Sequence, residues 1–349
     1  ITFTTGRALF TTKNGGSPSF CFIVKETTAK GKRKNKMKKE LKKQMNRTVR
    51  SVFIYHLILV GVSFLYILWK SAGNAGLTGV DAFSEQMLKY AMDKAGLLSL
   101  AGTAAGLLYM AVRYRKTKDI RHMLHEKKPM TIQVFLAAFC VFMSCQVLFA
   151  AASSLAELLL NPFGYTLSKA AESASAVSTT FSMFFYSTLA GPIAEELVFR
   201  GYIMRRLLPF GKEFAIVISA VLFGLIHGNF LQGSFAMGAG LVLGYIAVEY
   251  SMKWSLVIHI LNNLVFSDLM GRMSEMMAEP LKSVFTCGVP AAFFITAVLI
   301  LFLNREKIKK WRKNNRIGKR YCLYAFTSVW MILFIIMEVM TAMNGVSKI

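Results

Sequence analysis

Charged residues are scarce in this sequence, and acidic residues are the scarcest. Only 17% of the 349 residues are Asp, Glu, Lys or Arg, whereas 54% are hydrophobic. A soluble globular chain carries about 25% charged residues, so these proportions exclude an ordinary soluble protein of this length. Several uninterrupted apolar stretches have roughly the 20 residues that a helix needs to cross a bilayer. The sequence therefore predicts a polytopic membrane protein.

Cysteine is also scarce, which argues against a disulfide-bonded framework. The sequence has five cysteines, and no spacing among them suits a disulfide scaffold or a thiolate zinc site. Four lie in or beside apolar stretches and one lies in the N-terminal tail, in this order: Cys140, Cys145, Cys287, Cys322 and Cys21. We interpret them as small packing residues.

The basic residues are unevenly distributed. There are 42 of them against 18 acidic residues, a formal net charge of +24. They crowd into 30–50, 113–128 and 304–320, between or beside apolar stretches. The positive-inside rule places such segments in the cytoplasm, so we expect a cytoplasmic N-terminus and anionic lipid headgroups at these loops. Nucleic acid is not an expected partner, because the sequence has no aromatic-interleaved basic surface or binding motif.

The apolar segments predict an all-α transmembrane helix bundle of about eight or nine spans. The spans are expected near 51–69, 97–112, 131–152, 177–207, 213–227, 231–250, 254–270, 284–303 and 322–343. Residues 1–50 are expected to form a basic, disordered tail. Because position 1 is not methionine, we interpret part of this tail as an over-extended reading frame with Met37 or Met45 as the true start.

An acidic motif lies toward the end of the fourth predicted span. Glu195 and Glu196 are adjacent, and Arg200 follows four residues after Glu196. Residues four apart share a helix face, so Glu196 and Arg200 are expected to pair, whereas Glu195 lies about 100° around the helix. An ion pair that only holds helices together would explain one carboxylate and leave Glu195 unexplained. A partly desolvated, unpaired carboxylate suits a general base that takes a proton from water.

Two later spans carry one histidine each, with a partner four residues away. Phe223 precedes His227, and Asn263 follows His259. A lone histidine in an apolar span is usually a satisfied core residue, but an imidazole and a carboxamide on one face can also stabilise an oxyanion. Counted from the inner ends of straight spans, Glu195, His227 and His259 lie roughly 15, 22 and 8 Å deep. They converge only if the helices tilt or break.

The complete pattern resembles the CPBP family, also called the Abi or CAAX protease family, of intramembrane glutamic endopeptidases. The resemblance covers about 177–266, and its motif positions are Glu195, Glu196, Arg200, Gly201, Phe223, His227, His259 and Asn263. It implies that 177–270 is a four-helix catalytic core, flanked by accessory spans at 51–176 and C-terminal spans at 271–349.

The resemblance also implies roles for the motif residues. Glu195 and His227 would activate water, and His259 and Asn263 would form the oxyanion hole, with support from Glu196, Arg200 and Phe223. The expected activity is hydrolysis of peptide bonds in membrane-associated or lipidated substrates. Bacterial relatives are associated with bacteriocin self-immunity or with processing of other membrane peptides, and a bacterial plasma membrane is the expected location.

The residues alone leave three alternatives to a metal-free protease. Two histidines and a glutamate could bind zinc with one open position, but the sequence lacks a His-Glu-x-x-His helix, and we favour a metal-free site without a cofactor. A second alternative is a non-catalytic immunity or sorting factor that binds a peptide in the same cavity. A third, a transporter with a proton relay, predicts inverted repeats, which we do not find in the sequence.

Overall fold

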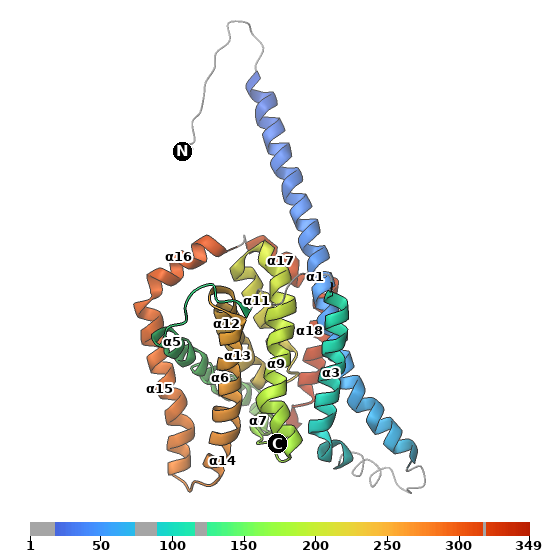
Figure 1. The fold of residues 1–349 in the computed structure, drawn as a ribbon, viewed down its shortest axis with the longest axis vertical. Coiled ribbons are helices and arrows are strands. Elements are labelled where there is room, and N and C mark those ends of the chain that lie inside the picture. The colour runs from blue at the N-terminus through green and yellow to red at the C-terminus, as the bar shows by residue number, and fades with distance from the viewer. Residues whose placement is uncertain (1–17, 74–88, 116–123, 317–318) are drawn as a thin grey trace.

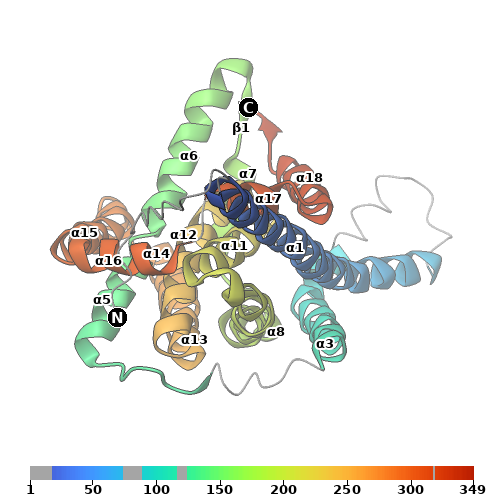
Figure 2. The ribbon, with the colours of Figure 1, turned by 90° about the horizontal axis from the view of Figure 1, so that it is seen from above.

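The computed structural model describes residues 18–73, 89–115, 124–316 and 319–349, and these are almost entirely helical (Figure 1). The prediction of an all-α bundle is confirmed. In the described ranges, β-structure is confined to β1 (Tyr165–Thr166) and β2 (Ser347–Lys348), which pair antiparallel. This pair joins the C-terminal end of the chain to the loop after α6 (Gln146–Leu160) (Figure 2).

Five helical stretches are long and apolar enough to cross a membrane. They are 35–71 within α1 (Pro18–Gly73), α3 (Ala95–Tyr114), the run 132–163 formed mainly by α5 (Ile132–Met143) and α6, α12 (Phe230–Glu249) and α15 (Leu281–Leu303). These apolar helices indicate an integral membrane protein. The segments predicted at 177–207, 213–227 and 254–270 are shorter or interrupted helices, so the count of nine spans stays a prediction.

The helices around the acidic motif are interrupted by π-helical turns. One helical run comprises α8 (Phe181–Phe185), η2 (Tyr186–Ala190), α9 (Gly191–Glu195), η3 (Glu196–Met204) and α10 (Arg205–Leu207), and a second comprises α13 (Met252–Leu261), η5 (Asn262–Leu269) and α14 (Met270–Glu275). Of these, η2, η3 and η5 are π-helical. Short π segments inside α-helices are uncommon and are frequent at functional sites. Straight helices would leave Glu195, His227 and His259 at different depths. The π-helical turns are breaks of the kind that can bring these residues together.

A close helix hairpin lies at the centre of the bundle. It consists of α11 (Lys212–Leu225) and α12, joined by Gly228 with φ +56° and by Asn229, whose side chain caps α12. A Cβ on Gly224 would lie 2.7 Å from the carbonyl oxygen of Gly233, and a Cβ on Gly233 would lie 2.9 Å from that of Gly224. Only glycine permits this approach of the two backbones.

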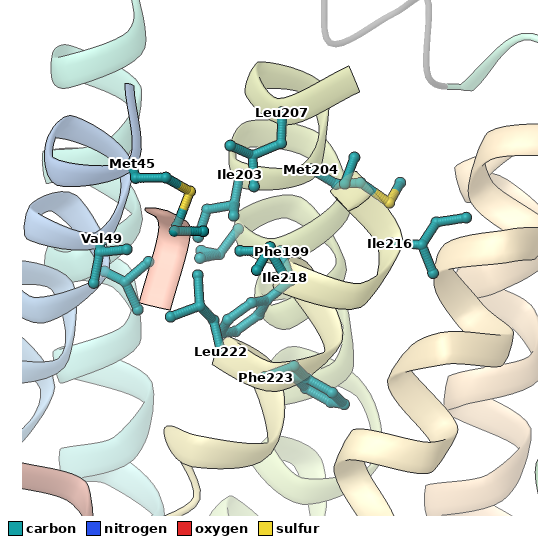
Figure 3. Packing of buried hydrophobic residues seen from close by; sticks show 14 of the residues in the cluster. Met45, Val49, Phe199, Ile203, Met204, Leu207, Ile216, Ile218, Leu222 and Phe223 are labelled. Carbon is teal, nitrogen blue, oxygen red and sulfur yellow. The ribbon is translucent and has the colours of Figure 1, made fainter. Parts of the chain in front are cut away.

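The second half of the expected N-terminal tail is part of the core. Leu41, Met45 and Val49 recur at helical spacing along one face of α1 and are fully buried. Figure 3 shows Met45 and Val49 on the side of α1 that faces Ile203 and Leu222. The expectation of a disordered tail up to position 50 is therefore corrected for 35–50, while residues 1–17 lie outside the described residues.

Two acids near the ends of apolar segments, Glu249 and Glu338, are buried and paired. Glu249, at the end of α12, accepts hydrogen bonds from Lys128, Lys212 and Trp311 of α16 (Arg305–Asn315). Lys127 donates to the carbonyls of the last turn of α12, where a positive charge also favours the helix dipole. The loop before α5, the start of α11 and α16 are thereby tied to one end of α12.

The other acid, Glu338, connects the first and last long helices. It lies in α18 (Val329–Met343), is buried, and has a carboxylate oxygen 2.9 Å from Nδ1 of His56 in α1. The remaining elements complete the chain and are η1 (Asn161–Phe163), α7 (Ser168–Ser175), η4 (Leu208–Phe210) and α17 (Lys319–Phe326).

We predict that Gly224→Ala destabilises the fold, because the new methyl group would overlap the Gly233 carbonyl and force α11 and α12 apart. Overpacking of this kind costs about 1–3 kcal/mol. Thermal unfolding in detergent micelles measures the effect. Gly61→Ala in α1 is the control, since a Cβ there meets nothing within 4 Å, and an equal loss in both variants would contradict the packing argument.

Candidate functional site

A buried carboxylate, Glu196, joins two of the helical segments that the sequence predicted to converge. It is 1% exposed. One of its oxygens lies 3.1 Å from Nη1 of Arg200 and 3.1 Å from Nδ1 of His259. The other accepts a 2.5 Å hydrogen bond from the hydroxyl of Ser255. Glu196 therefore links η3 to α13, and the predicted ion pair with Arg200 is present.

Arg200 has no exposed surface and depends on Glu196 for compensation of its charge. Its guanidinium nitrogens make no hydrogen bond of proper geometry with the described residues. The guanidinium carbon lies 4.5 Å from the ring centroid of Phe223, a distance typical of a cation–π contact. Arg200 is thus held between a carboxylate on its own helix and an aromatic ring on α11.

Glu195, the adjacent acid, has a different environment. Its side chain is 27% exposed, and its nearer carboxylate oxygen lies 3.5 Å from Nε2 of His259. The two glutamates therefore flank the two nitrogens of one imidazole, Glu196 on the sealed side and Glu195 on the open side. A neutral imidazole can donate from only one nitrogen, so donation to Glu196 leaves Nε2 of His259 as an acceptor facing Glu195.

The two histidines of the site contact one aromatic ring, that of Phe223. Phe223 contacts both edge-on, with centroid distances of 5.0 Å to His227 and 5.8 Å to His259. Nδ1 of His227, just past the end of α11, lies 2.7 Å from the carbonyl oxygen of Phe223, four residues earlier. This contact orients the His227 ring and leaves its Nε2 pointing away from the backbone of α11.

Asn263 contacts the neighbouring helical run rather than the glutamates. Its amide nitrogen donates to the carbonyl oxygen of Ser187 in η2, at 2.8 Å, and its amide oxygen accepts from Asn262 at 2.9 Å. No contact between Asn263 and the carboxylates is found in the described residues. The structure thus places Asn263 in the same helix as His259 but brings it to the η2 side of the site.

An ion pair near the end of η5 joins this helical run to the segment before α8. Arg272 bonds to both oxygens of Asp268, one turn earlier, and donates to the carbonyl oxygen of Ser178. The amide of Ser178 in turn donates to Asp268, and its hydroxyl lies 3.0 Å from that of Ser187. The segment before α8 is thereby fixed against η5 and α14.

Sequence reasoning missed three polar residues of the site: Ser255, Asn262 and Ser187. A spacing signal was present for Ser255, which lies four residues before His259 and therefore on the same helix face. Asn262 is buried and orients Asn263. Ser187 contributes only its backbone carbonyl to Asn263, and no sequence pattern identifies such a contact.

The described residues contain no group of three or more His, Cys, Asp or Glu side chains arranged to hold a metal ion. Glu195, Glu196 and His259 are close to one another, but both nitrogens of His259 already face carboxylates. The preference for a metal-free site remains a prediction.

Comparison with known families supports the reading of this segment. Residues 177–265 match the family described as type II CAAX prenyl endopeptidase Rce1-like. The match contains all the candidate site residues, and the resemblance to the CPBP family is confirmed for this segment. It supports a CAAX-type intramembrane protease in general. Neither curated proteins nor solved structures gave a match to the chain.

We predict that Arg200→Met destabilises the protein by about 3–5 kcal/mol, because Glu196 then keeps a buried charge without the guanidinium. The double variant Arg200→Met/Glu196→Gln should recover part of this loss, since it removes the uncompensated charge as well. Chemical unfolding in detergent measures both. A double variant less stable than Arg200→Met would contradict the dependence of the two groups on each other.

We also predict that Ser255→Ala costs about 1–3 kcal/mol, because the buried Glu196 carboxylate loses a hydrogen-bond donor. Ser283→Ala is the matched control, since its hydroxyl bonds to Glu279 on the exposed surface, and such changes cost about 0.5 kcal/mol or less. The same unfolding measurement applies. Equal stability of the two variants would show that Ser255 adds nothing to the burial of Glu196.

Proposed function

We propose that the chain is an intramembrane endopeptidase in which Glu195 acts as the general base toward a hydrolytic water. The observation that carries this proposal is the unequal environment of two adjacent glutamates. Glu196 is buried and has three side-chain partners, whereas Glu195 is partly exposed and has its nearer oxygen 3.5 Å from Nε2 of His259. A base must reach both water and a neighbouring group that helps to hold the proton.

The sealed carboxylate serves as an anchor in this proposal. Glu196 accepts from Ser255 and pairs with Arg200, which fixes its position before any substrate arrives. Donation from Nδ1 of His259 to Glu196 then fixes the ring and its tautomer, as a buried carboxylate does for a catalytic histidine in other hydrolases. Nε2 of His259 is left beside Glu195, where it can stabilise the protonated carboxyl group.

The proposed reaction has balanced proton transfers. Glu195 removes one proton from water as the water oxygen attacks the peptide carbonyl carbon, which gives a tetrahedral oxyanion. When the carbon–nitrogen bond breaks, the proton on Glu195 passes to the leaving amine. The products are a carboxylic acid and a free amine, and the enzyme returns to its starting state.

The roles of His227 and Asn263 follow the family resemblance and are part of the proposal. The ring of His227 is fixed by the Phe223 carbonyl, which directs Nε2 away from α11, so it can assist in orienting the water. Asn263 uses one amide hydrogen on Ser187, and a carboxamide has a second. That second hydrogen could donate to the oxyanion. His259 was expected to share the oxyanion hole, but its contacts with both glutamates favour the role described above.

The substrate class and location are proposed with the activity. We expect peptide bonds of membrane-associated or lipidated proteins, because the site lies on helices that run beside the apolar spans α3 and α12. Anionic lipids are expected at the basic loops, with the N-terminus in the cytoplasm of a bacterial cell. A peptide-binding immunity or sorting factor would use the same cavity without catalysis.

We predict that Glu195→Gln lowers the cleavage rate by about 10²–10⁴-fold, the usual contribution of a general base. The amide keeps the shape of the side chain but cannot take the proton. Cleavage of a quenched-fluorescent, prenylated CAAX-type peptide in lipid vesicles measures the rate. Mass spectrometry of membrane peptides from cells that carry either form identifies natural substrates.

The control for this variant is Glu172→Gln on the exposed surface of α7, which should cleave like the intact protein. The unfolding temperature of Glu195→Gln should stay near that of the intact protein, because the Glu195 side chain is partly exposed and bonds only weakly. If the Glu195→Gln protein kept full activity in cells, the binding function would replace the enzymatic one.

A further inference from the structure

A cavity lined almost entirely by arginine lies between α1, α3 and α10. Its volume is about 670 Å³. Its lining residues are Arg47, Arg50, Val112, Arg113, Arg115 and Arg206. We propose that this arginine cavity binds a phosphate-bearing anion, and that the source of the phosphate is the headgroup of an anionic membrane lipid. This inference does not depend on the proposed protease activity.

The charge of the cavity calls for an anionic occupant. Four arginines, Arg47, Arg50, Arg113 and Arg115, line this volume together with Arg206, and no carboxylate is among the described lining residues. A carboxylate, Glu40, lines the adjacent cavity that shares Arg206. The ion pairs found in the described residues do not include Arg47, Arg50, Arg113 or Arg115. Like charges held together repel one another, and an anion between them would remove that repulsion.

Guanidinium groups favour phosphate in particular. Each presents a planar fork of N–H donors that matches two phosphate oxygens, and charge-assisted bonds of this kind are about twice as strong as neutral ones. The cavity size falls within the range of sites that hold small organic ligands, about 300–1,000 Å³. A lipid headgroup with its phosphodiester therefore fits the volume as well as the charge.

One wall of the cavity is held in place by stacked aromatic rings. The guanidinium carbon of Arg206 lies 4.7 Å from the ring centroid of Tyr114, which is buried and stacks on Tyr202 at 5.2 Å. Arg113 contacts the same ring at 5.8 Å. Arg47 and Arg50 are exposed and three residues apart, so they lie on one face of α1. Arg113 and Arg206 are thus held in place before a ligand binds, which lowers the entropic cost of binding.

The position of the cavity identifies the lipid as the source. It lies where α3 ends and beside Arg47 and Arg50 of α1, which directly precede the apolar stretch of that helix, and both helices are apolar enough to cross a membrane. Headgroup phosphates lie at this level of a bilayer. The negative end of the α3 dipole, equivalent to about half a charge, also faces this region, but five guanidinium groups outweigh it.

The experiment compares three proteins. They are the intact chain, the variant Arg47→Gln/Arg50→Gln/Arg113→Gln, and the control Lys307→Gln/Lys310→Gln/Lys313→Gln, which loses the same charge from the exposed face of α16. Each protein is titrated in detergent with short-chain phosphatidylglycerol, with phosphatidylcholine and with inorganic phosphate. Native mass spectrometry and the rise in unfolding temperature measure binding.

We expect the intact protein and the lysine control to bind phosphatidylglycerol more tightly than phosphatidylcholine. The arginine variant should lose about fivefold in affinity for each arginine removed, or about a hundredfold in total. The unfolding temperature of the arginine variant without lipid shows whether that variant is folded. If the triple variant does not fold, Arg50→Gln alone carries the test, with an expected loss of about fivefold.

The other outcomes overturn all or part of the proposal. Equal losses in the arginine and lysine variants would show a general basic surface rather than a site. Stabilisation by inorganic phosphate to the same extent as by phosphatidylglycerol would support the phosphate chemistry but overturn the lipid as its source. Binding of a polyglutamate peptide with no binding of either phosphate source would replace the proposal with an acidic-peptide site.

Discussion

The site depends on one buried ion pair, Glu196 with Arg200. Bringing two charges out of water costs several kcal/mol for each ion, and their attraction rarely exceeds that cost. The pair is tolerable here because Ser255 and His259 also bond to Glu196, and the Phe223 ring covers Arg200. These contacts join the η3, α11 and α13 segments at one point. The main effect of the pair is therefore to fix the position of His259, and its effect on stability is smaller.

The fixed position of His259 determines the environment of Glu195. Adjacent residues on a helix point about 100° apart, so one acid can be sealed inside while the next one faces the opening. His259 spans the two environments, with one nitrogen on each side. One π-helical segment begins at Glu196, and another begins at Asn262 and packs against η2. Irregular backbone is thus concentrated where the polar groups meet, while the apolar helices around it stay regular.

The sequence predicted the parts of this arrangement that arise from helical spacing. The pairing of Glu196 with Arg200, the separation of Glu195 from it, and the shared face of Phe223 and His227 all follow from residues one to four apart. The contacts of Glu338 with His56 and of Glu249 with Lys128 involve residues far apart in the chain. No periodicity contains that information, so the sequence did not predict either contact. The burial of Leu41, Met45 and Val49 was missed for a different reason: they do recur at helical spacing, but the residues between them are mostly charged, and the composition outweighed the pattern.

The basic residues show how far a composition argument extends. As a group they indicate one side of the membrane, and the structure divides them into different environments. Lys128 and Lys212 neutralise Glu249 and hold helices together, whereas Arg47, Arg50 and Arg113 face a cavity whose described lining has no acid. Positive charge that is paired inside the protein is not available to a membrane. Of the basic residues expected to meet anionic headgroups, the arginines of the cavity are therefore the ones to which we assign that role as a proposal.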